Sequence, residues 1–119
     1  MSARNRRGAS AEGLARRHLE RAGLRLRTAN YRCKLGEIDL VMTDRAGSLV
    51  FVEVRYRARR DFGGPAASVD ARKRQRLIRA ARVYLSQHGL HERPARFDVV
   101  GIDAEEQIDW ITGAFSADD

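Results

Sequence analysis

The sequence is poor in cysteine and has no long apolar run. Its 119 residues include one cysteine, Cys33, which cannot form an internal disulfide or a cysteine-rich zinc site and is expected to lie half-buried in a loop. No stretch approaches the roughly 20 apolar residues that cross a bilayer. The basic residues at 1–8 are not followed by the apolar segment of a secretory signal. We therefore expect a cytoplasmic protein of one domain, without a membrane partner.

Positive charge is what the sequence has in excess. Lys and Arg total 23 against 16 Asp and Glu, which gives a formal net charge of +7. The pI is near 10.7. Only Lys34 and Lys73 are lysines; every other cationic side chain of this set is arginine. A domain this basic commonly binds a polyanion, so nucleic acid is the expected partner.

Apolar periodicity and turn residues predict an α/β domain. One helix is expected over residues 10–22, with Ser10 as its cap and Gly23 at its end. A second should run from about residue 69 or 71 to 88, capped by Ser68 or Asp70 and ended by Gly89. The predicted strands are 24–30, 37–43, 49–57, 96–103 and 107–111. Residues 1–9 are expected to be a flexible basic arm, 31–36 a loop, 10–115 the domain and 116–119 a frayed acidic tail.

The predicted order is therefore α-β-β-β-α-β-β. The first three strands would form a meander. The second helix can return the chain so that the fourth strand lies parallel to the third, through a right-handed crossover. The expected fold class is a mixed sheet with helices packed on it.

Two acidic residues lie on the most apolar strands. Because side chains alternate along a strand, Asp39 and Glu53 are predicted on faces opposite a wholly apolar set. That set is Ile38, Leu40, Met42, Val50, Val52 and Val54. A three-residue turn ending at Gly47 would place Asp39 opposite Glu53 and Glu37 opposite Arg55, with Cβ atoms about 5 Å apart. A bulge at the turn would shift this register by one residue.

Carboxylates held so close repel each other unless something compensates them. Mg²⁺ could compensate this repulsion, because it prefers oxygen ligands and is often held by one or two carboxylates, with water and substrate phosphate completing its shell. The alternative is a solvated face on which Asp39 and Glu53 pair with neighbouring arginines. The apolar strands and the basic excess favour a site.

Asp39 followed on the next strand by Glu53-Val54-Arg55 resembles the PD-(D/E)XK nuclease signature, in which the last position is lysine. The wider pattern is similar to that of the YraN-like family of bacterial proteins, over roughly residues 8 to 103. The matching motifs are Gly8, Ala11-Glu12, Asn30-Tyr31-Arg32, Gly36-Glu37-Ile38-Asp39-Leu40, Phe51-Val52-Glu53-Val54, Phe62-Gly63, Lys73-Arg74 with Leu77, Ala81 and Tyr84-Leu85, and Arg96-Phe97-Asp98-Val99. The resemblance implies a nuclease-like fold and an Mg²⁺- or Mn²⁺-dependent endonuclease. Analogy to Holliday-junction resolvases implies DNA rather than RNA as substrate, branched or otherwise structured, and a homodimer.

By position, the resemblance implies Asp39 and Glu53 as metal ligands, with Glu12 as a supporting acid. Glu37 is either a further ligand or an ion-pair partner of Arg55. Arg55 departs from the signature, because a guanidinium stays protonated and cannot act as a general base, although it can stabilise charge on a phosphate. Lys73, near the start of the second helix, is either the substitute for the missing lysine or one more solvated cation.

Arginines continue from the site strand into the following loop and along the second helix. The residues expected to contact phosphates are Arg57, Arg59, Arg60, Arg72, Arg74 and Arg76. Such contacts position nucleic acid with little sequence preference and weaken as salt rises. Two other functions stay open: a non-catalytic nucleic-acid-binding protein whose site has degenerated at Arg55, and a protein-interaction module in which the charge is incidental.

Overall fold

The predicted order of helices and strands is confirmed. The computed structural model describes residues 3–57 and 64–118, with side chains described from residue 11 onward. The elements are α1 (Ala3–Arg21), β1 (Arg25–Cys33), β2 (Gly36–Thr43), β3 (Leu49–Arg57), the 3₁₀ helix η1 (Ala66–Ser68), α2 (Ala71–Gln87), β4 (Ala95–Asp103) and β5 (Ile108–Phe115). Among these elements, no helix is both long enough and apolar enough to cross a bilayer.

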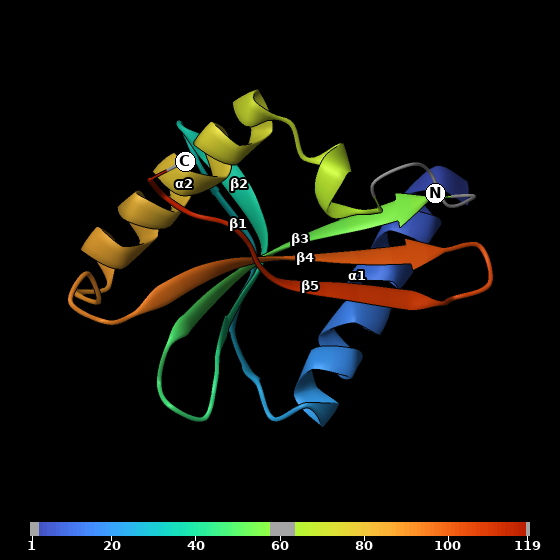
Figure 1. Ribbon diagram of the computed structural model, residues 1–119, viewed down its shortest axis with the longest axis horizontal. Coiled ribbons are helices and arrows are strands. Elements are labelled where there is room, and N and C mark those ends of the chain that lie inside the picture. Colours follow the sequence, from blue (N-terminus) through green and yellow to red (C-terminus); the bar gives the residue numbers. More distant parts are fainter. Residues whose placement is uncertain (1–2, 58–63, 119) are drawn as a thin grey trace.

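The five strands form one mixed sheet in the order β1-β2-β3-β4-β5. Only β3 and β4 run parallel; the other neighbours are antiparallel. Figure 1 shows a strongly twisted sheet with α1 behind it and α2 on its other side, and β1 and β2 turning away from β3, β4 and β5. The fold is therefore a mixed α/β arrangement of three layers.

Each helix covers one face of the sheet and creates its own core. On the α1 side, Ala15 and Leu19 pack with Leu40, Val50 and Val52. The larger core on the α2 side contains Ile38, Val41, Leu49, Phe51, Leu77, Ile78, Tyr84, Phe97 and Val99. Strands β2, β3 and β4 are buried on both faces, which explains why they read as nearly continuous apolar runs.

The turn between β2 and β3 is the three-residue turn that the sequence predicts. The amide of Asp44 donates to the carbonyl of Ser48 at 3.0 Å, and Gly47 adopts a left-handed φ of 88°. Residue pairing then runs from Thr43–Leu49 to Leu40–Val52. The predicted register is confirmed over this part of the hairpin, and the bulge that would have shifted it is absent from these pairs.

Two element boundaries near the N-terminus differ from prediction. Helix α1 begins at Ala3 rather than after a cap at Ser10, so the described residues of the expected flexible arm are helical. Alanine and arginine are both strong helix formers, and no proline interrupts them. Ala22, expected as the last residue of this helix, lies just after its end at Arg21 and is exposed.

The expected loop over 31–36 is mostly strand. β1 continues to Cys33, and only residues 34–35 separate it from β2. Tyr31 and Cys33 pack against the α2-side core, and this packing stabilises the extended conformation of residues 31–33. Strand β5 is also longer than expected, reaching Phe115, whose ring stacks on Phe97 with centroids 4.9 Å apart.

Helix α2 begins as predicted from its second cap. Oδ1 of Asp70 accepts a hydrogen bond from the backbone amide of Lys73 at 2.9 Å. This cap fixes the first turn of the helix. It places Lys73 on the side of the sheet where Glu53 lies, beside the carboxyl-terminal half of β3.

Candidate active site

The candidate site lies where β2 and β3 part. Their backbone pairing stops at Leu40–Val52, one residue before Asp39 and Glu53 would face each other. Here the Asp39 side chain replaces the backbone ladder: its Oδ2 accepts a hydrogen bond from the amide of Val54 at 2.8 Å. Asp39 is therefore held against β3 by its own carboxylate, which leaves Oδ1 for other partners.

Glu53 is a buried acid with two cations beside it. Only 5% of its surface is exposed. Its Oε2 lies 3.4 Å from Nζ of Lys73 and 3.5 Å from Nη2 of Arg55. Neither contact has hydrogen-bond geometry, so Oε2 has no hydrogen-bond partner among residues 11–57 and 64–118, and the same holds for Nε of Arg55. The site thus contains charge compensation but unused hydrogen-bonding capacity.

The two carboxyls are close enough to control each other's protonation. Burial raises the pKa of Glu53 from 4.5 to about 8, with further increases from a hydrogen bond and charge repulsion with Asp39; Lys73 and Arg55 act in the opposite direction. Desolvation and a like charge both disfavour the ionised carboxylate. Near neutral pH the pair therefore holds a proton that a bound cation would displace.

On its other side, Asp39 faces α1. A polar cavity of about 180 Å³ is lined by Glu12, Asn30, Tyr31, Arg32, Glu37, Ile38 and Asp39. Burial and the charge of Asp39 raise the pKa of Glu12, whereas a hydrogen bond with Asn30 lowers it. Asp39 therefore links two acidic neighbours, Glu12 from the α1 side and Glu53 from the α2 side.

Glu37 lines this cavity but pairs with a different cation from the one expected. Its Oε2 lies 3.7 Å from Nε of Arg32, and its side chain is about half exposed. Arg55 instead approaches Glu53. The Glu37–Arg55 ion pair, one of the two alternatives for Glu37, does not form, because β2 pairs with β3 only over residues 40–43 and the two strands are apart at residue 37.

The four acids proposed as metal ligands do not form one cluster. Within the described part of the chain, no group of three or more His, Cys, Asp or Glu side chains is arranged to hold an ion. The donor set that fits a cation is the pair of Asp39 and Glu53, since Mg²⁺ often takes only one or two carboxylates and keeps several waters. Glu12 and Glu37 lie around this pair rather than within it.

Lys73 reaches the site, as the sequence allowed. Its ammonium and the Arg55 guanidinium both approach the same oxygen of Glu53. The β3 strand and the α2 helix therefore each bring one cation to the carboxyl pair. The departure from the signature at Arg55 is accompanied by a lysine from another element.

The expected phosphate contacts divide into three groups. Arg72 and Arg76 are exposed on α2. Arg74 is partly engaged inside the fold: its Nε donates to the carbonyl of Val69 at 2.8 Å, and its guanidinium lies 5.4 Å from the ring centre of Phe115. Arg57 is half-buried at the end of β3, and Arg59 and Arg60 lie outside the described residues.

Sequence reasoning gave Asn30 no role, although it shapes the site. It adopts a left-handed φ of 55°, which asparagine tolerates better than most residues. On either side of it, Ala29 pairs with Leu40 and Tyr31 pairs with Ile38, and these pairs face opposite helices. Its residue type is a sequence signal for this conformation, because asparagine enters the left-handed region more readily than most residues.

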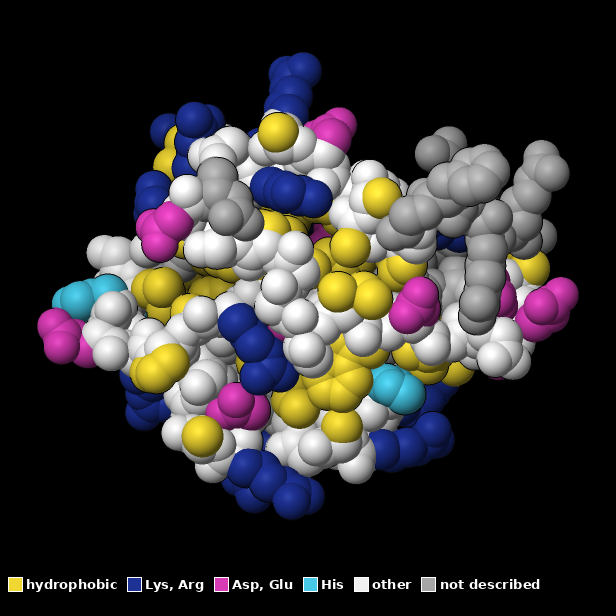
Figure 2. Space-filling model, viewed as in Figure 1, with side chains coloured by type: hydrophobic (Ala, Val, Ile, Leu, Met, Phe, Trp, Pro, Cys, Tyr) yellow, Lys and Arg dark blue, Asp and Glu magenta, His cyan; other side chains and the backbone are white. Residues whose placement is uncertain are grey.

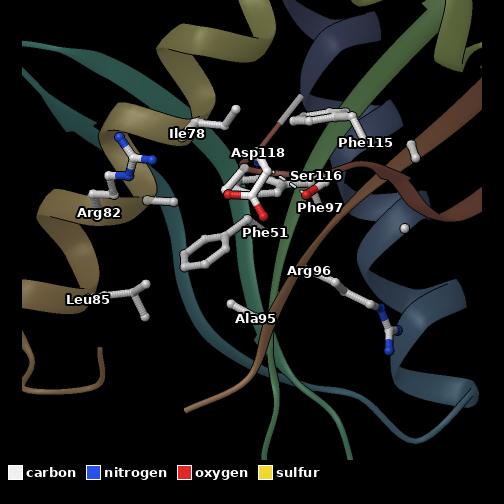
Figure 3. A pocket seen from close by; sticks show the side chains of 14 residues that line it. Phe51, Ile78, Arg82, Leu85, Ala95, Arg96, Phe97, Phe115, Ser116 and Asp118 are labelled. Carbon is white, nitrogen blue, oxygen red and sulfur yellow. Dashed lines mark hydrogen bonds between the residues drawn. The ribbon is translucent and has the colours of Figure 1, made fainter. Parts of the chain in front are cut away.

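A second hollow lies away from these residues. It has a volume of about 650 Å³ and is formed between α2 and the chain end after β5. Figure 3 shows Leu85 and Arg82 on its α2 side, Phe51 and Phe97 at its floor, Phe115 from the end of β5 and Asp118 from the residues that follow. None of the predicted site residues that the structure describes lines it, so it is separate from the carboxyl pair.

Comparison with known proteins gives a family. Residues 11–102 match the model of "Uncharacterised protein family UPF0102". A UPF0102 protein of Dechloromonas aromatica is 55% identical over 113 residues, covering 95% of this chain and 91% of the relative. One from Xanthomonas oryzae pv. oryzae is 53% identical over 120 residues, covering 99% and 98%. One from Stutzerimonas stutzeri is 50% identical over 114 residues, covering 92% and 94%. The chain therefore belongs to the UPF0102 family, the YraN-like family that the motifs indicated.

Proposed function

We propose that the protein is a metal-dependent nuclease of the PD-(D/E)XK type that hydrolyses phosphodiester bonds in DNA. One observation carries this proposal: Asp39, Glu53 and Lys73 converge at one point from β2, β3 and α2. Paired carboxyls with an ammonium beside them are the groups that metal-assisted phosphodiester hydrolysis needs. The mixed sheet with a helix on each face supports the same fold assignment.

Asp39 and Glu53 would hold Mg²⁺ or Mn²⁺, which would supply Lewis acidity toward a phosphate and lower the pKa of water. The protein's own residues prepare for this. The Val54 amide fixes the Asp39 carboxylate, so that it need not reorganise when a cation binds. Lys73 and Arg55 offset the charge of Glu53 and can stabilise negative charge on a phosphate.

Binding of the substrate would depend on phosphate contacts near the site. Arg72 and Arg76 extend from the α2 turns that follow the Asp70 cap, and both are exposed. Phosphate contacts of this kind position the duplex without reading its sequence. The preference for DNA, the homodimer and the cytoplasmic location stay predictions.

A non-catalytic nucleic-acid-binding protein is the second candidate, and one observation favours it. Glu53 already has two cations within 3.5 Å, so its charge is compensated without a metal. In that case Arg55 and Lys73 would be structural partners of a degenerate site. The two functions predict the same binding and different turnover.

The deciding experiment incubates the protein with labelled duplex, branched and single-stranded DNA, and with RNA, in Mg²⁺, in Mn²⁺ and in chelator. Metal-dependent cleavage that is lost in Asp39→Asn and Glu53→Gln supports the nuclease. Glu37→Gln is the matched control, because it removes a nearby acid that already pairs with Arg32. Salt-sensitive binding without cleavage would support the second candidate, and cleavage that persists in both site variants would refute the assignment of these residues.

A further inference from the structure

A leucine is exposed at the tip of the β1–β2 hairpin. Among the side chains of residues 11–57 and 64–118, Leu35 and Tyr56 are the large apolar residues exposed by about a third or more, and Leu35 is the more exposed at 50%. The hairpin turn is only two residues long, Lys34 and Leu35, so the leucine stands at its end. Burial would have been favourable for this side chain, and the fold leaves half of it in water.

The tip is held firmly, so its exposure is not that of a loose loop. Gly36 follows the leucine and is buried against α2, where a Cβ atom would collide with the backbone carbonyl of Arg76. Before the turn, Cys33 packs on the α2-side core. Next to it, Arg32 and Glu37 form an ion pair across the two strands. Contacts from β1, β2 and α2 therefore hold the turn in place.

Basic residues lie close to this apolar tip. Arg32 and Lys34 precede it in the chain, and both are exposed. Because Gly36 touches α2 at Arg76, the exposed arginines of that helix, Arg72 and Arg76, belong to the same part of the surface. In Figure 1 the ends of β1 and β2 reach the upper left beside α2, and Figure 2 shows Lys and Arg side chains projecting around that edge.

We propose that the β1–β2 turn is a nucleic-acid wedge, in which Leu35 enters the base stack while the flanking cations hold the phosphates. This inference rests on the proposed function and specifies which kind of DNA the nuclease would bind. Proteins that kink nucleic acid commonly insert one apolar side chain between bases and compensate the backbone charge with Lys and Arg. The β1–β2 turn has both features, because it presents an exposed apolar side chain next to basic residues. Insertion is least costly where stacking is already broken, so the wedge favours duplex DNA at a nick or an unpaired base.

The start of β2 connects the turn to Asp39 of the carboxyl pair. Asp39 lies four positions after Leu35, and at about 3.3 Å per residue this is roughly 13 Å along the chain. That length corresponds to about four base-pair steps of 3.4 Å. Cleavage is therefore expected about four nucleotides from the nick or unpaired base.

The test measures binding in chelator, where no cleavage can occur. Matched DNA duplexes are compared, one intact, one with a nick and one with an unpaired base, each with a fluorescent base analogue beside the defect. The wild-type protein should prefer the defective duplexes and unstack the analogue. Leu35→Ala should reduce that preference by about tenfold while binding to the intact duplex stays the same. Leu35→Met, which keeps an apolar side chain of similar length, should retain it.

The outcomes separate this inference from the nuclease itself. Equal affinity of the wild-type protein for intact and defective duplexes, or an unchanged preference in Leu35→Ala, would overturn the wedge and leave the nuclease proposal standing. A Leu35-dependent preference without cleavage in Mg²⁺ or Mn²⁺ would support the wedge and refute turnover. Because Leu35 is half exposed, Leu35→Ala should unfold with the wild-type midpoint, which excludes misfolding as the cause of a lost preference.

Discussion

Replacing Glu53 with glutamine should change how the stability of the protein depends on pH. Burial beside Asp39 raises the pKa of Glu53 from 4.5 to about 8, so the folded state holds a proton that the unfolded chain releases. The stabilisation from that proton is complete below pH 4.5 and is lost as pH rises to about 8. At about 1.4 kcal/mol per pKa unit, the loss across this window is on the order of 5 kcal/mol.

The Glu53→Gln variant cannot lose that proton, so its free energy of unfolding should vary much less between these pH limits. Urea unfolding of metal-free protein, followed by circular dichroism across the range, measures the difference directly. Glu37→Gln, at a half-exposed acid paired with Arg32, should keep the wild-type slope. Mg²⁺ added at the upper end should restore stability to the wild-type protein but not to Glu53→Gln. Parallel pH profiles of wild type and Glu53→Gln would refute the raised pKa and the proton shared with Asp39.

Three further substitutions test other contacts. Lys73→Met removes a cation that lowers the pKa of Glu53, so the upper end of the pH range over which stability is lost should move upward; an unchanged profile in the same urea series would contradict the contact. Gly36→Ala forces a Cβ into the backbone of α2 and should lower the free energy of unfolding by about 2–4 kcal/mol, measured by thermal and urea denaturation. Trp110→Phe removes an indole N–H that donates to the buried Asp98 at 2.9 Å and should cost about 1–3 kcal/mol; a loss under 0.5 kcal/mol would show that another donor replaces it.

The hairpin that carries the two acids could be predicted from the sequence because its information is local. Alternating apolar residues define β2 and β3. The length of the turn that ends at Gly47 fixes which residues of the two strands pair with each other. A single slip would have exposed the core face, so few alternatives compete. The cap at Asp70 likewise placed the start of α2, and with it Lys73.

Features that depend on contacts between distant elements could not be predicted in this way. The side chain of Asp39 replaces a backbone acceptor for Val54, and no periodic pattern encodes that exchange. Alternation assigns Ile38 and Leu40 to one face of β2, yet Ile38 lies in the α2-side core and Leu40 in the α1-side core, and the change of face occurs opposite the left-handed Asn30 of β1. The length of β1 depends on packing against α2, which overrides the weak turn signal before Gly36.

The hydrogen bond between Asp39 and the Val54 amide has a consequence for the evolution of this family. Because one carboxylate both closes a gap in the sheet and faces the other acids, losing it would weaken the domain whether or not these acids take part in a reaction. Persistence of an aspartate at this position among relatives is therefore poor evidence that they are active. Glu53, whose burial as an anion opposes folding at high pH, is the more informative marker, since a lineage in which this carboxyl has no function would gain stability by losing it.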